Sequence, residues 1–494
     1  MILLSTNRLK RYSKEVLKHI GYEPISNQIK PVHIANGLFR LVLGEEYDIK
    51  SLNEWSKRFS QQKEINSAEK IKKDYIDVID EEMTLEEINE LRYFLELIFN
   101  ADNAVTPSVK FSTLTIASKT QVTKEVQNEF GIPRFLYRIL NVKVDGMPSP
   151  CIDIIKSHLN NENDEISRIA QPLVSIDSTS KKKISIEEKD IELSGIELRI
   201  RQAFDNLALN DKENGNKLLS LERIVLFSCF ATILHLSSRI LDISDKYCED
   251  DRIPLLFDAD GSLQAIKYAS QETLLLARLG IEEYFEKVLE VIFRDEQYHI
   301  LTKDEILKRI DETPLAESSR KKNKASEDEK REDYKNLFLG FYEQSQNPFD
   351  AIVKATRFLL FSDVYSTDPS GFISSLGGKI GLLAPRAGGG GRKRYSPDPI
   401  ILEIIILSLL KKGEKVRLTD FGKRLWMQFG IIIGANPEED MERLGKWNIS
   451  QNIPGDLAGS LALNAEKIAD LYISMGYGKR YADGVTMLSI SGGV

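Results

Sequence analysis

The stretch LERIVLFSCFATILHL, from Leu221 to Leu236, constrains the fold of this chain more than any other feature. Ser220 can cap a helix that runs to about Leu241, and apolar residues cover nearly every side of the middle of that helix. A helix without a polar face has to be covered by other helices, so it belongs at the centre of a bundle. This apolar stretch and the one at Ile400–Leu410 are both shorter than the roughly 20 residues that cross a bilayer. The sequence therefore predicts a helical protein that does not span a membrane.

Length, charge and cysteine content narrow the class of protein. A chain of 494 residues exceeds what one hydrophobic core usually supports, so we expect about two to four domains. The net charge of −8 argues against a general nucleic-acid coat, which is basic overall. Three cysteines without a CxxC pair fit neither a disulfide framework nor a structural zinc site. The N-terminus turns basic after a short apolar run, unlike a signal peptide, so we expect a cytoplasmic location.

Local signals indicate several further elements. Two capping boxes, Thr84–Glu87 and Thr302–Glu305, predict the starts of amphipathic helices. The β-branched stretch Val109–Thr123 predicts a strand or two. Two apolar runs flank Asp260-Gly261, which is typical of a β-hairpin. The segment 318–333 is almost purely charged and polar, which indicates either a linker or a solvated helix end.

The C-terminal part of the chain follows a definite order of elements. The predicted elements are a helix at Ile400–Leu410, a strand at Val416–Leu418, helices at Thr419–Phe429 and Asn464–Met475, and a strand within Tyr481–Ile490. This order resembles the winged-helix variant of the helix-turn-helix. The predicted fold class is therefore mainly α: a multi-domain helical protein with minor β hairpins and a C-terminal winged-helix-like domain.

The expected domain organisation has five parts. They are a mixed, mostly helical N-terminal domain (1–175), a helical bundle (191–317), a charged linker (318–333), a helix with a basic glycine-rich loop (334–398) and the winged-helix-like domain (399–494). The winged-helix resemblance implies that the third helix reads DNA. Its expected exposed positions include Glu466, Lys467 and Asp470, however, and acidic side chains are poorly suited to a phosphate-lined groove. A protein partner and DNA therefore remain equal alternatives for this domain.

A basic segment precedes the C-terminal domain. Between Pro369 and Pro397 the chain carries no acidic residue, and the centre of the segment reads APRAGGGGRKRYSP. Four glycines leave backbone N–H groups uncovered and three adjacent cations can neutralise phosphates, although the GxxxxGK[ST] pattern of a P-loop is absent. The segment is interpreted as a nucleic-acid backbone contact, a loop ordered by a partner, or a solvated connector. The candidate nucleic-acid contacts, which include two cations before the last strand, are Arg386, Arg392, Lys393, Arg394, Lys479 and Arg480.

No constellation of residues in the sequence points to catalysis. The five histidines lie at no metal-ligand spacing from one another or from a cysteine. Asp258 and Asp260 would point the same way on a strand, where the pair can hold a cation, as in a metal-dependent nuclease. The D…(D/E)xK nuclease pattern is broken, because Ala265 stands two places before Lys267. The alternative for the two aspartates is a solvated turn, and we predict no catalytic residue, cofactor or metal.

In general style the chain resembles the accessory proteins of bacterial anti-phage defence operons, through the LERIVLFSCFATILHL helix, the IPLLFDADGS segment and the winged-helix-like order. This resemblance implies a large helical protein that works beside an ATPase or nuclease subunit. We therefore expect a non-catalytic accessory or scaffold subunit that binds a protein partner. Direct DNA binding through the C-terminal domain and the basic segment is one alternative, and a metal-dependent nuclease that uses Asp258 and Asp260 is another.

Overall fold

The protein is mainly helical, as the sequence predicts, and its strands are short. The computed structural model describes residues 6–24, 29–47, 68–74, 82–90, 129–159, 181–183, 192–212, 214–242, 252–312, 327–364, 368–386, 388, 392–453, 455–482 and 484–490. The strands predicted within Val109–Thr123 lie outside these residues.

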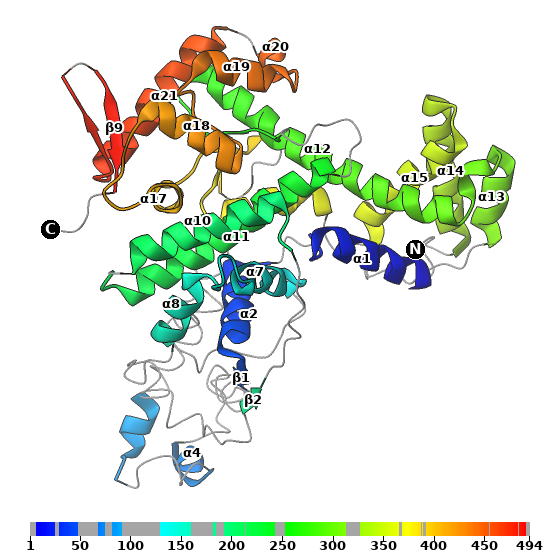
Figure 1. Ribbon diagram of the computed structural model, residues 1–494. Helices are drawn as coiled ribbons and strands as arrows, with labels where there is room; N and C mark the ends of the chain where they lie inside the picture. The colour runs from blue at the N-terminus through cyan, green and yellow to red at the C-terminus, as the bar shows by residue number, and fades with distance from the viewer. Residues whose placement is uncertain are drawn as a thin grey trace.

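The apolar helix of the sequence is α11 (Lys217–Asp242), and it lies at the centre of a bundle as predicted (Figure 1). From Leu221 to Ser237 every residue except Glu222 is buried. The helices that contact α11 include α1 (Thr6–Ile20), α2 (Pro31–Leu43), α7 (Ile132–Asn141), α8 (Pro150–Leu159), α10 (Gly195–Asp211) and α16 (Phe372–Lys379).

The apolar part of α11 is longer than the sequence suggested. The 21 residues from Leu219 to Arg239 have the length and composition of a membrane span, but 89% of the apolar window is buried inside the protein. Neighbouring helices thus cover the surface that lipid would otherwise contact, as for the core helix of a soluble protein.

A 32-residue helix, α12 (Gln264–Asp295), runs from the C-terminal part of the molecule to a group of shorter helices, here called the arm (Figure 1). The arm consists of η3 (Tyr298–Ile300), α13 (Lys303–Glu312), α14 (Glu327–Ser345), α15 (Pro348–Leu359) and η4 (Leu360–Val364). Near the start of α12, Ile266 and Ala269 pack in one cluster with Leu457 and Leu461. Towards its end, α12 packs against α15, where Arg357 pairs with Glu282 and Glu286. One continuous helix therefore joins the two regions.

The C-terminal module, residues 399–490, contains the predicted helices and strands in the predicted order, together with four elements that the sequence did not predict: β7, α19, α20 and β8. Its elements are α17 (Pro399–Leu409), β6 (Lys415–Arg417), α18 (Leu418–Phe429), β7 (Ile431–Ile432), α19 (Pro437–Gly445), α20 (Ile449–Asn452), α21 (Leu457–Ser474), β8 (Gly478–Arg480) and β9 (Thr486–Ser489). The third predicted helix, α21, begins seven residues earlier than Asn464 because Asp456 caps it through a hydrogen bond from Gly459 N. Strands β6, β9 and β8 form an antiparallel sheet in that order.

The β-hairpin predicted around Asp260-Gly261 is wrong. Strand β3 (Leu255–Leu256) pairs in parallel with β7 of the C-terminal module instead. The apolar run after Gly261 is the first turn of α12, so the turn joins a strand to a helix and not two strands. The remaining paired strands are β1 (Glu45–Tyr47) with β2 (Lys181–Lys183), and β4 (Leu383–Ala384) with β5 (Arg394–Tyr395).

Both predicted capping boxes are confirmed by reciprocal hydrogen bonds. Thr84 N donates to Glu87 Oε2 at 2.8 Å, and Glu87 N donates to Thr84 Oγ1 at 3.2 Å. The same pattern at Thr302 and Glu305 starts α13. Two shorter helical pieces complete the described elements: η5 (Pro369–Gly371) and α4 (Ala68–Asp74).

Candidate functional site

The helices α14 and α15 form a hairpin in the arm, and local chemistry fixes its sharp reversal. The Asn347 side chain accepts hydrogen bonds from Phe349 N and Asp350 N, which caps α15, and Pro348 occupies the first turn. Further along, a buried hydrogen bond of 2.7 Å joins the Tyr334 and Thr356 hydroxyls across the two helices. The hairpin is therefore held at both its turn and its base.

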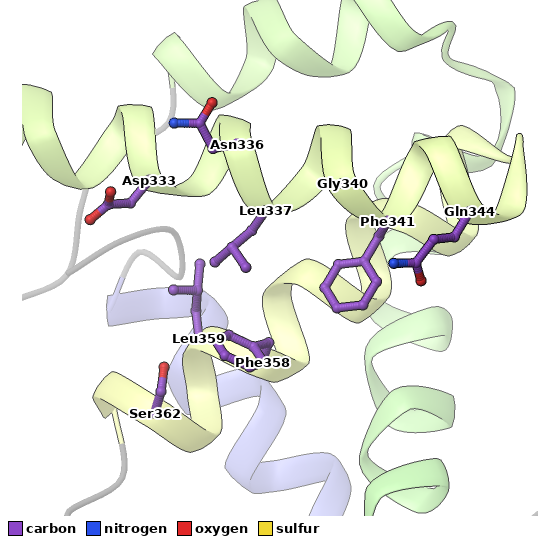
Figure 2. Close-up of a pocket in the computed structure, with 9 residues that line it drawn as sticks. All are labelled: Asp333, Asn336, Leu337, Gly340, Phe341, Gln344, Phe358, Leu359 and Ser362. Atoms are coloured by element: carbon purple, nitrogen blue, oxygen red, sulfur yellow. The ribbon is translucent and has the colours of Figure 1, made fainter.

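An open groove of about 570 Å³ runs between these two helices (Figure 2). Leu337 and Phe341 extend from α14 towards Phe358 and Leu359 of α15. Phe358 is 44% exposed, which is high for a phenylalanine that the fold could have buried. The residues that line the groove are Asp333, Asn336, Leu337, Gly340, Phe341, Gln344, Phe358, Leu359 and Ser362.

Gly340 forms part of the groove wall in the middle of α14. Glycine inside a helix costs roughly 1 kcal/mol relative to alanine. A Cβ atom added at this position would meet no other atom within 4 Å. The internal packing of the described residues therefore does not require a glycine here, and its effect is to lower the wall of the groove.

The charges of α14 are unevenly distributed around the helix. Two of its three cations face α13: Arg331 donates to Ile310 O at 2.6 Å, and Lys335 pairs with Asp311. The third, Lys330, lies about two turns before Leu337 on the groove side. Glu332 and Glu343 are exposed, and neither has a side-chain partner among the residues that the structure describes. These two carboxylates are eleven residues apart, about three helical turns, so they lie on one side of the helix next to the groove-lining residues. The groove therefore has an acidic rim.

Most of the basic side chains that were predicted to bind nucleic acid in this segment bind other groups of the protein instead. Arg386 pairs with Asp398, and Lys393 donates to the carbonyl oxygens of Ser374 and Arg386. Burial lowers the pKa of Lys393, because a desolvated ammonium group is less stable than the neutral amine. The Arg392 side chain is exposed, and its backbone oxygen accepts a hydrogen bond from Gln271 of α12.

Two groups of candidate residues that are far apart in the sequence meet at Asp258. Arg394 Nε donates to Asp258 Oδ2 at 2.5 Å, and Asp258 is only 1% exposed. Asp258 Oδ1 accepts from Gly261 N at 2.8 Å, which fixes the turn before α12. Both oxygens of this carboxylate thus have donors from the protein itself.

Asp260 pairs with a different cation from the one that Asp258 binds. Its Oδ2 accepts from Lys467 Nζ at 2.6 Å, and its Oδ1 accepts from Ser262 N and Oγ. Desolvation alone would raise the pKa of Asp260, but the hydrogen bonds from Lys467 and Ser262 outweigh it and lower the pKa to about 2. No group of three His, Cys, Asp or Glu side chains within the described ranges is arranged to hold a metal ion.

The other two predicted contacts lie on β8. Arg480 pairs with Asp470 of α21 at 2.8 Å, while the Lys479 ammonium lies 5.6 Å from the centre of the Tyr481 ring. In the sheet, Arg417 and Lys479 both stand opposite Met487, one on each side. These side chains share the outer face, since Val416 and Leu488 of the intervening rows are buried.

The groove between α14 and α15 is not predicted by the sequence. One signal was present in the sequence: Gly340 interrupts the apolar run NLFLGFYEQ in a segment that is otherwise helical. The pairing of α14 with α15, which creates the groove, could not be read from that signal. Comparison of the chain with protein-family models, with curated proteins and with solved structures finds no match in any of the three.

Proposed function

We propose that this protein is a non-catalytic accessory or scaffold subunit that binds a protein partner through the groove between α14 and α15. The observation that carries the proposal is the open groove, lined by apolar and polar side chains in similar measure, with Phe358 exposed on one wall and Gly340 on the other. An exposed apolar surface with a polar rim is typical of a protein-binding site. The resemblance to anti-phage accessory proteins implies a cytoplasmic partner that is an ATPase or nuclease subunit.

Substitution of Gly340 tests this proposal with two variants at one position. Gly340→Trp is expected to fill the groove and to reduce partner capture about tenfold or more, whereas Gly340→Ala leaves most of the groove open. Both variants should fold, because an added Cβ atom meets no atom within 4 Å, the groove beside it is open, and each residue favours a helix more than glycine does. The measurement is quantitative affinity capture from nuclease-treated native cells. Equal capture by wild-type protein and Gly340→Trp would reject the groove as the binding site.

The control for folding is the thermal stability of the same two variants. Gly340→Ala should raise the free energy of unfolding by about 0.5–1 kcal/mol, because alanine loses less backbone entropy on entering a helix. A Gly340→Trp protein that captures no partner yet unfolds at or above the wild-type temperature has lost the binding surface and not the fold.

A second candidate function is contact between the C-terminal module and a nucleic-acid backbone. We propose it because the order of α17, β6, α18, α21 and β9 resembles that of a winged helix, with β7, α19 and α20 inserted, and because cations gather on the outer face of its sheet. Lys415 and Arg417 on β6 are exposed and have no side-chain partner among the described residues, and Lys479 lies on the same face. The exposed face of α21 carries Glu466 and Asp470, which favours the sheet over this helix as the contact surface.

The salt dependence of binding tests the second candidate. The logarithm of the affinity for duplex DNA falls linearly with the logarithm of the salt concentration. Each phosphate contact contributes about −0.9 to the slope of that line. The triple variant Lys415→Gln, Arg417→Gln, Lys479→Gln is therefore expected to flatten that slope by about 2.7. The matched control is Arg424→Gln, since Arg424 is already paired with Glu414. If the triple variant and the wild-type protein show the same slope, this sheet does not contact DNA.

A further inference from the structure

We infer that the partner element held in the groove between α14 and α15 is an amphipathic helix with a basic flank, an inference that rests on the proposed function. The groove-lining positions of α14 run from Asp333 to Gln344, and the eleven steps between these two residues correspond to about 16 Å of helix. Three turns of a partner helix have the same length. The surface is thus long enough to receive residues at positions i, i+4, i+7 and i+11 of another helix.

The walls of the groove favour a helix over an extended peptide. They are built from the side chains of α14, α15 and η4, and the backbone N–H and C=O groups in the interior of these helices are already paired within each helix. An extended peptide would find no row of backbone partners of the kind a sheet edge offers, so its own backbone groups would remain unpaired where it covers apolar surface. A helix satisfies those groups internally.

Gly340 determines how closely a partner helix can approach. Helices pack with their axes about 8–10 Å apart, and the smaller separations require small residues at the contact. Gly340 lies between the levels of Leu337 and Phe341 on α14, with open space above it. A large apolar side chain of the partner would rest on Gly340 and contact Phe341 and Phe358 beside it.

The acidic rim specifies the charge of the partner helix. Glu332, Asp333 and Glu343 are exposed on or beside the groove side of α14, where Lys330 is the one cation of this helix that does not face α13. Three carboxylates against one ammonium group leave this rim acidic. A basic flank on the partner places lysine or arginine opposite these carboxylates, while an acidic flank is repelled. The same acids disfavour nucleic acid in this groove.

Selection from a displayed library of random 20-residue peptides tests the inference without knowledge of the natural partner. The full-length chain serves as bait, and Gly340→Trp serves as the counter-selection bait. We expect the enriched peptides to show apolar residues at helical spacing, to carry a net positive charge, and to lose binding to Gly340→Trp. Any one of three outcomes overturns the inference. These are enriched peptides that show no helical period, enriched peptides that show no preference for positive charge, and a selection in which no enriched peptide depends on the groove.

A charge exchange provides the second readout. The variant Glu332→Lys, Glu343→Lys is expected to bind the selected basic peptides about tenfold more weakly and to prefer versions in which lysine is replaced by glutamate. Unchanged affinity for the basic peptides would show that the rim does not set specificity. The proposed function and the helix inference can fail separately. If Gly340→Trp no longer captures the natural partner but the selected peptides show no charge preference, the helix inference is rejected and the proposed function is retained. Undiminished capture by Gly340→Trp removes the proposed function itself.

Discussion

Replacement of Asn464 by alanine is expected to lower the free energy of unfolding by about 3–5 kcal/mol. The side chain of this residue of α21 is completely buried and makes three hydrogen bonds to backbone groups. Its Nδ2 donates to Phe257 O at 2.7 Å and to Ile433 O at 3.0 Å, and its Oδ1 accepts from Ala259 N at 3.0 Å. Alanine removes the partner of all three backbone groups, two of them in buried bonds and one in a partly buried bond, and each buried unsatisfied group costs about 1–3 kcal/mol.

The location of these bonds explains why the effect should reach beyond one helix. Phe257 directly follows β3 and Ile433 directly follows β7, so Asn464 ties α21 to the ends of both strands of the parallel pair. Urea unfolding gives the free energy, and hydrogen exchange at the Ala259 amide reports the local opening. Leu463→Ala is the matched control, because Leu463 is the preceding residue and is 51% exposed. A loss below 1 kcal/mol in Asn464→Ala would contradict the assigned role.

Replacement of Asp258 by alanine is expected to cost about 3 kcal/mol, because it leaves the Arg394 guanidinium in a largely buried position without its carboxylate. The side chain of Arg394 is 15% exposed, and that of Asp258 is 1% exposed. The substitution also removes the acceptor of the Gly261 N–H in the turn before α12. Asp258→Asn retains an acceptor for that N–H and should therefore lose less stability than Asp258→Ala.

The neighbouring aspartate provides the control for this substitution. Asp260 forms an ion pair with Lys467 in which the side chains are 47% and 38% exposed, and exposed pairs contribute about 0–1 kcal/mol. Asp260→Ala should therefore change the stability much less than Asp258→Ala. Thermal unfolding of both variants at neutral pH makes the comparison. Equal losses in the two variants would show that Asp258 has no special structural role.

The sequence predicted those parts of the fold that local patterns determine. The composition of Leu221–Leu236 alone places α11 at the centre, because a helix without a polar face has one stable environment. The order of α17, β6, α18, α21 and β9 was also evident, since apolar spacing and glycines mark each boundary. The boundary of α21 was missed, because its cap at Asp456 follows a stretch that offers no periodic signal.

The contacts between distant segments could not be predicted from the sequence. Asp258 and Arg394 are separated by 136 positions, and each has a plausible local role, in a turn and in a basic loop respectively. Only the packing of β5 beside α12 brings them together. The groove also depends on such packing, because no pattern in the sequence predicts that Leu337 and Phe358 line the same surface. Whether the cations of β6 and β8 contact DNA stays a prediction.

The continuous helix α12 fixes the distance between the C-terminal module and the arm. Its 32 residues correspond to about 48 Å at 1.5 Å per residue, with the C-terminal module packed near its first turns and the arm near its last turns. A flexible tether of equal residue number would sample many end-to-end separations, whereas an intact helix permits one. The separation between two molecules bound at the opposite ends of α12 would accordingly stay constant.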